Sequence, residues 1–229
     1  MHDQRPAFVR GPLVPRLRYL ILLTLAVMLG LSQTGCIQFV ANMIHAVHGD
    51  NVPAEYEGLA DKKVAVITIT DTSQYSNDIS ARMLTRYVSE ILKTEVKGIK
   101  LVREDEVEQW RDTQGWEAID YVALGRGVKA DKVVSIELTD LRLREGQTMY
   151  RGHAGATITV HDVASGSREF RRTLDDYTYP VTAGLFTTET TEDKFRRVYL
   201  DMLGQRIARY FHPYDFRDGV ADDAKIVHQ

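Results

Sequence analysis

The segment Gly125-Arg-Gly127-Val-Lys-Ala130 matches the G-x-G-x-x-A pattern of dinucleotide-binding loops. Such a loop needs a strand before it and a helix after it, because the backbone amides at the start of the helix bind the phosphate. Here a predicted helix precedes the motif and a predicted strand follows it. The motif therefore predicts the end of a helix, where glycine supplies left-handed backbone, and no nucleotide site.

Four carboxylates could supply acid–base chemistry: Asp71 and the consecutive acids Glu104, Asp105 and Glu106. Two converging carboxyl groups would suit a hydrolase that cleaves a polymer. Acids at 104–106 are also typical of the first turn of a helix, where they complement the helix dipole. We favour the helix interpretation and keep the hydrolase as the alternative.

Metal binding and nucleophilic catalysis find little support in the sequence. His153 and His161 share one face of a predicted strand but lie eight residues apart, about 26 Å along the strand, which is too far to bind one metal ion. The chain has no G-x-S-x-G motif, and Cys36 is its only cysteine. The sequence thus predicts no catalytic residue, no metal site and no cofactor.

Cys36 has a different predicted role, which depends on the residues before it. Basic residues precede an uncharged run at 19–31, and this order is typical of an export signal. The run is shorter than the roughly 20 apolar residues of a spanning helix. Thr34-Gly35-Cys36 then resembles a bacterial lipobox. That resemblance implies that Cys36 is diacylated and that the signal is cleaved before it.

Gln33 departs from the lipobox pattern, which has Leu or a similar aliphatic residue at this position. One alternative is an uncleaved anchor, since apolar residues continue at helical spacing from Ile37 to Val47; another is cleavage elsewhere. Each possibility places the main domain outside the cytoplasm. The residue after the cysteine is Ile37 and not Asp. The resemblance to enterobacterial lipoproteins then implies sorting to the outer membrane, on its periplasmic face.

The composition indicates one ordinary domain with extensions. The chain has 229 residues, of which 44% are hydrophobic and 27% charged, and its net charge is −3. These values exclude a polytopic membrane protein and give no sign of nucleic-acid binding. We expect a signal peptide at 1–35, a lipidated tether at 36–61, an α/β domain at 62–211 and a disordered tail at 212–229.

Within 62–211 the hydrophobic periodicity predicts the order β-α-β-α-α-β-β-β-α. The fold class is therefore α/β (α+β), with a mixed sheet of about five strands covered by helices. A change of phase near Asp140 predicts a β-bulge in the first strand of the final meander. The expected strands are 64–70, 99–103, 131–144, 150–163 and 168–179; the expected helices are 78–94, 104–111, 117–128 and 190–211.

The hairpin in this meander carries a family resemblance. Asp162, Val163, Ser165 and Gly166 occupy a strand–turn pattern, Asp-Val-x-(Thr/Ser)-Gly. The pattern resembles that of envelope lipoproteins with an anticodon-binding-like α/β domain, namely the curli-secretion lipoproteins and the lipoprotein activators of penicillin-binding proteins. The resemblance covers roughly residues 62–211. It implies a role in binding or assembling other proteins.

Aromatic side chains near the end of the last strand are the candidate partner-binding residues. Tyr177, Tyr179 and Phe186 surround a loop at 179–190 that is rich in Thr and Gly. Aromatic residues are enriched at interfaces because they offer a large contact area at low entropic cost. The alternative is that these rings only cover an open sheet edge. The arginines near 168–172 and 196–197 are interleaved with acids, which is typical of a solvated face.

Together these features predict a lipid-anchored protein of the bacterial envelope. We expect a non-catalytic module that binds a protein partner or self-associates. The alternatives are an envelope hydrolase using the acidic residues and a signal-anchored membrane protein of unknown role. A pore is disfavoured, because loop 179–190 is too short for a membrane hairpin with strands of about 9–11 residues.

Overall fold

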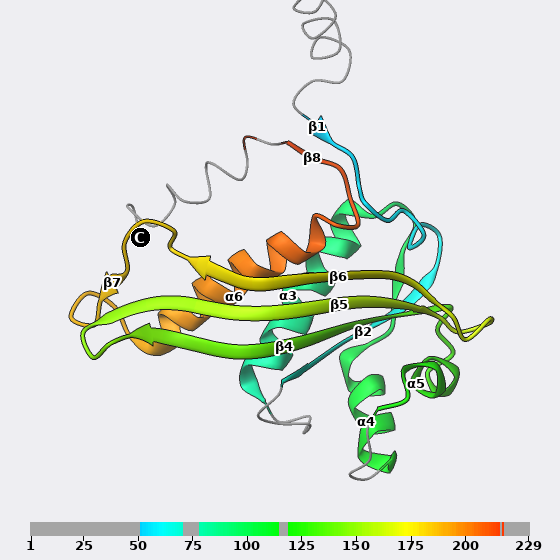
Figure 1. The fold of residues 1–229 in the computed structure, drawn as a ribbon. Coiled ribbons are helices and arrows are strands. Elements are labelled where there is room, and N and C mark those ends of the chain that lie inside the picture. The colour runs from blue at the N-terminus through cyan, green and yellow to red at the C-terminus, as the bar shows by residue number, and fades with distance from the viewer. Residues whose placement is uncertain (1–50, 71–77, 115–118, 216, 218–229) are drawn as a thin grey trace, which may run out of the picture. The chain divides into compact units, whose positions relative to one another are not determined.

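A mixed sheet forms the frame of the domain (Figure 1). Its strand order is β3-β2-β4-β5-β6, and the short strand β7 pairs with β5. The first three strands are parallel, and the last three form an antiparallel meander. The strands are β2 (Lys63–Thr70), β3 (Lys100–Leu101), β4 (Lys132–Glu145), β5 (Met149–Asp162), β6 (Arg168–Tyr179) and β7 (Leu185–Phe186).

This structure is a computed structural model that describes residues 51–70, 78–114, 119–215 and 217. Cys36 and Asp71 lie outside the described residues, and so do the predicted signal peptide and most of the predicted tail. Within the described ranges, no helix is long and apolar enough to cross a bilayer.

Helices cover both faces of the sheet. Helices α3 (Ile79–Glu95) and α6 (Glu192–Ala208) pack side by side on one face (Figure 1). Helices α4 (Glu104–Gln114) and α5 (Tyr121–Gly127) pack on the other face, against β2 and β4. The residues of β2 alternate between these two cores, which explains why this strand is apolar on both sides.

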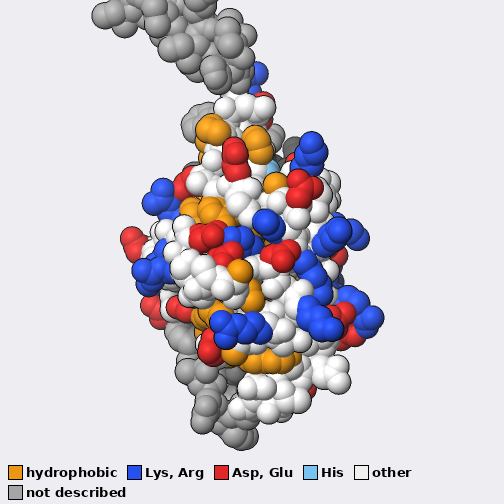
Figure 2. All heavy atoms as spheres, turned by 90° about the vertical axis from the view of Figure 1, so that its right-hand side faces the viewer, with side chains coloured by type: hydrophobic (Ala, Val, Ile, Leu, Met, Phe, Trp, Pro, Cys, Tyr) orange, Lys and Arg blue, Asp and Glu red, His pale blue; other side chains and the backbone are white. Residues whose placement is uncertain are grey.

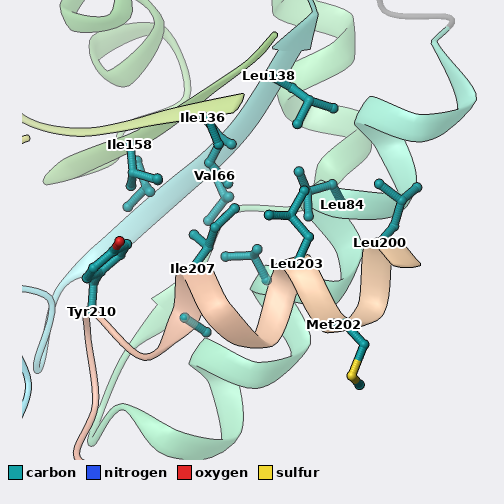
Figure 3. Packing of buried hydrophobic residues seen from close by; sticks show 14 of the residues in the cluster. Val66, Leu84, Ile136, Leu138, Ile158, Leu200, Met202, Leu203, Ile207 and Tyr210 are labelled. Atoms are coloured by element: carbon teal, nitrogen blue, oxygen red, sulfur yellow. The ribbon is translucent and has the colours of Figure 1, made fainter. Parts of the chain in front are cut away.

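The larger core lies between the sheet and the α3–α6 pair (Figure 3). Val66, Ile136 and Ile158 project from the strands, while Leu84 of α3 and Leu203 of α6 project towards them. All of these side chains are buried. Local capping fixes the start of α3, because the Asp78 carboxylate accepts hydrogen bonds from the amides of the first helical turn.

The expected fold class and the order of the nine main elements agree with the structure. The expected bulge is confirmed: the pairing of β4 with β5 shifts register between Thr139 and Arg142, and Asp140 has a φ of 53°. Three short strands were not predicted. They are β7 and the pair formed by β1 (Asn51–Val52) and β8 (Tyr214–Asp215).

Residues 51–61 belong to the folded domain, although the sequence analysis assigned them to the tether. Asn51 and Val52 pair with β8, and Leu59 is 1% exposed within the main core. The Tyr56 amide donates to the carbonyl of Tyr210, 2.9 Å away. These contacts are long-range, so the polar composition of this segment gave no sign of them.

The helix end at the G-x-G-x-x-A motif also differs from expectation. The left-handed residue is Lys129, with a φ of 55°, and neither motif glycine has a positive φ. The glycines instead allow close packing. A Cβ atom at Gly125 would lie 2.3 Å from Val163, and one at Gly127 would lie 2.2 Å from Trp110.

Candidate functional site

The three candidate aromatic residues have different environments. Tyr179 is 2% exposed and belongs to the main core, so its ring is not available to a partner. Tyr177 is half-buried, and its carbonyl accepts a hydrogen bond from the hydroxyl of Tyr199. Phe186, in contrast, is 52% exposed. Of the three, Phe186 is the residue that presents its ring to solvent.

Val181 joins Phe186 on the same loop, with 54% of its surface exposed. Three large hydrophobic side chains are exposed among the described residues, and the third, Ile79, starts α3. Isolated exposed apolar residues are ordinary, but two on one loop are more informative. Sequence reasoning missed Val181, because only the positions of aromatic residues were considered.

Backbone contacts hold this loop in place. Phe186 and Leu185 pair with Met149 and Tyr150 of β5. The Arg151 guanidinium donates to the carbonyl of Val181, 2.9 Å away. The exposure of Val181 and Phe186 therefore belongs to a loop that is tied to the sheet.

A groove of about 440 Å³ lies beside this loop, against the first half of α6. Its apolar lining comes from Leu185, Phe195 and Val198, and its charged lining comes from Lys194, Arg197 and Glu189. The volume falls in the range of common ligand and peptide sites. We call Val181, Phe186 and this groove the apolar loop surface.

The apolar loop surface lies at one end of the long strands, and residues 51–61 lie at the other (Figure 1). Phe186 pairs with Met149 at the start of β5, whereas Val160, near its end, pairs with Phe170. The two ends are about 35 Å apart along an extended strand.

Figure 2 shows the domain from the side of the β5–β6 hairpin, where basic and acidic side chains are interspersed and hydrophobic ones form small groups.

A charged network links the N-terminal segment of the domain, residues 51–61, to the sheet. The Lys132 ammonium lies 2.7 Å from an Asp162 oxygen and 2.6 Å from a Glu169 oxygen, and its side chain is 8% exposed. The Tyr56 hydroxyl donates to Glu169, and Arg172 pairs with Glu55. Hydrogen bonds from Lys132 hold the pKa of Glu169 and of Asp162 below their usual range. Burial has the largest effect on the pKa of Tyr56, and together with the hydrogen bond to Glu169 it raises this pKa to about 12.

This network predicts a loss of stability in acid. The folded-state pKa values of Glu169 and Asp162 are lowered, so the folded state binds fewer protons than the unfolded state. The two carboxylates contribute fully to the free energy of unfolding at a pH above their unfolded-state pKa values, which are near 4. This contribution is lost as the pH falls through their lower folded-state pKa values. Lys132→Met should make the unfolding midpoint in urea less dependent on pH below about 5. Lys93→Met, at an exposed site on α3, is the control. An equally steep acid loss in both variants would contradict this role for Lys132.

The described acidic candidates are paired with arginines. Glu104 lies 3.6 Å from both Arg82 and Arg86, and Asp105 pairs with Arg103. The hydrogen bond from Arg103 lowers the pKa of Asp105, whereas a general acid at neutral pH needs a raised one. Within the described residues, this is not the convergent carboxyl pair that a hydrolase would need.

The two strand histidines also have separate surroundings. His153 lies 3.2 Å from Asp176, and the ring of His161 packs against Tyr121 with centroids 5.0 Å apart. Burial lowers the pKa of His161. No group of three or more His, Cys, Asp or Glu side chains that could hold a metal ion occurs in the described parts of the chain.

No protein-family model and no curated protein matches the chain. Its fold is similar to that of several solved structures. One is the PelC dodecamer from Paraburkholderia phytofirmans, with 13% identity over 71% of this chain and 95% of that chain, and a TM-score of 0.39. Lipoprotein GNA1162 from Neisseria meningitidis is 12% identical over 64% of this chain and 97% of that chain, with a TM-score of 0.42.

The C-terminal domain of LpoB from Salmonella enterica is 12% identical over 52% of this chain and 83% of that chain, with a TM-score of 0.36. LpoB is a penicillin-binding-protein activator lipoprotein, so these neighbours include the group that the hairpin pattern resembles. These similarities are similarities of fold.

Proposed function

We propose that this protein is a lipid-anchored module of the bacterial envelope that binds a partner protein without catalysing a reaction. The observation that carries the proposal is the apolar loop surface. Two exposed hydrophobic side chains lie on one tied-down loop, beside a groove with an apolar lining. Such a combination suits an interface, where a few apolar anchors supply most of the binding energy.

The charges of the groove favour a particular kind of partner. Lys194 and Arg197 outweigh Glu189, so the apolar groove carries a net positive charge. A complementary partner presents an apolar side chain with an acidic residue next to it. The apolar contacts would supply affinity, and the charges would favour correct partners over incorrect ones.

The lipid anchor limits where that partner can be. Lipidation at Cys36 leaves residues 37–50 before the folded domain, which reach at most about 50 Å when fully extended. This is less than the sequence suggested, since residues 51–61 belong to the domain. A short connection favours a partner in the same membrane. We assign the protein to the periplasmic face of the outer membrane, following the residue after Cys36.

Removing the exposed ring should weaken this binding. Phe186→Ala is expected to lower affinity for the partner about tenfold or more, the effect of truncating a central aromatic anchor. Ile79→Ala removes an apolar side chain of similar exposure from the start of α3 and should leave affinity unchanged. The measurement is titration of the purified partner, once identified, against both variants and the wild type.

Photo-crosslinking in the native envelope identifies that partner. The probe is placed at Phe186 or Val181, and a probe at Ile79 serves as the control. We expect one heterologous protein to be captured from the first two positions and not from the third, and to be lost when Phe186→Ala is combined with the Val181 probe. Crosslinks confined to the same chain would mean that the loop only covers the sheet edge.

A further inference from the structure

Strand β6 forms one outer edge of the sheet (Figure 1). It runs from Arg168 to Tyr179, and its ladder partner among the described residues is β5 alone. An edge strand of this length offers backbone amides and carbonyls to another strand. Side-chain contacts with the N-terminal segment, through Glu169 and Arg172, involve only its first half.

The net charge of β6 changes sign along the strand. The first half holds Arg168, Arg171 and Arg172 against one acid, Glu169, and the second half holds Asp175 and Asp176 at a bulge. All of these residues are exposed. Scattered charges on an edge prevent pairing, but separated charges act differently. They repel a second β6 that runs parallel, because like charges would then lie opposite each other, and they attract one that runs antiparallel.

The face pattern of β6 limits the antiparallel registers to those whose two-fold axis is centred on a residue. Leu174, Arg172 and Phe170 pair with core-facing residues of β5, whereas Thr173 and Arg171 pair with Thr157 and Thr159 on the opposite face. A two-fold axis perpendicular to the sheet requires that opposing residues share a face.

With the axis at Thr173, each residue meets a neighbour on its own face. Thr173 faces Thr173 of the second copy, and Arg172 faces Leu174. Arg171 faces the acidic bulge, and Phe170 faces Tyr177, which lies on the core side opposite Ala154. The extra residue of the bulge brings the second half of the strand back into phase.

We propose that β6 pairs with β6 of a second copy of this chain, antiparallel about a two-fold axis at Thr173, so that one sheet runs through the dimer. Two symmetry-related contacts between Arg171 and the Asp175–Asp176 bulge select this register.

A unique disulfide tests the axis. Opposing residues in an antiparallel pair have Cα atoms about 4.5–5.5 Å apart, within the range that a disulfide spans. In the full chain with Cys36→Ser, Thr173→Cys should form a disulfide-linked dimer on mild oxidation. Thr94→Cys, at a threonine of α3 that is also exposed, should not. Equal crosslinking at both positions, or none at Thr173, would overturn the proposal, as would disulfide capture of a different protein.

Charge reversal tests the register without depending on the stability of any one variant. Arg171→Asp alone, and Asp175→Arg with Asp176→Arg, should each weaken dimerisation about tenfold or more in analytical ultracentrifugation, because like charges then oppose each other. A mixture of the two variants should form a heterodimer, since both contacts become attractive again. Unchanged dimerisation of either variant alone, or a mixture that stays monomeric, would contradict this pairing.

Discussion

Cys36→Ala should abolish incorporation of radioactive palmitate in a bacterial host and move the protein out of the membrane fraction. Cys36 is the chain's only cysteine and directly follows Thr34 and Gly35 after an uncharged run at 19–31. One acyl chain binds a membrane only marginally, with a constant of about 10⁴ M⁻¹, whereas the three chains of the lipoprotein family give stable attachment. The loss should therefore be nearly complete.

The departure at Gln33 supplies the control. Gln33→Leu introduces the aliphatic residue that the lipobox has at this position, so labelling should persist or increase. Mass spectrometry of the mature N-terminus then separates lipidation from the alternatives. A wild-type protein that keeps residues 1–35 and takes up no label would show an uncleaved anchor and refute lipidation at Cys36.

Periodicity predicted the elements of the fold because each one buries a face of its own. Apolar residues recur at helical spacing in 78–94 and fill both sides of strand 64–70. These are local signals, and both agree with the structure. Segment 51–61 has no such signal. Its ordering depends on Tyr56 meeting Glu169 and Tyr210, residues more than 100 positions away. Contacts of this kind are set by tertiary packing and not by local pattern.

The candidate site was predicted only in part, for a related reason. Tyr179 and Phe186 belong to the same type of aromatic-rich segment, yet one is buried and the other exposed. Burial depends on where α6 lies. Gly152 of β5 illustrates this dependence, because a Cβ atom there would lie 2.0 Å from the ring of Tyr199. Nothing in the local sequence of β5 shows that an aromatic ring of α6 needs this space.

The packing of α6 leads to the largest expected effect on stability. Leu203 is fully buried and lies between α3 and the sheet, near Leu84 and Ile207 (Figure 3). Leu203→Ala removes a buried side chain and leaves a cavity, which costs about 3–5 kcal/mol of the free energy of unfolding. Since whole domains are stable by only about 5–15 kcal/mol, the variant should be severely destabilised.

Thermal and urea unfolding of the full chain measure this cost. A loss of about 3 kcal/mol corresponds to a fall in Tm of roughly 6–12 °C for a domain of this size. Ile79→Ala on α3 removes a similar aliphatic side chain that is 64% exposed, and its effect should stay within about 0.5 kcal/mol. The comparison depends on burial and not on side-chain type. If the two variants unfolded at the same midpoint, Leu203 would not be packed in the core between the helices and the sheet.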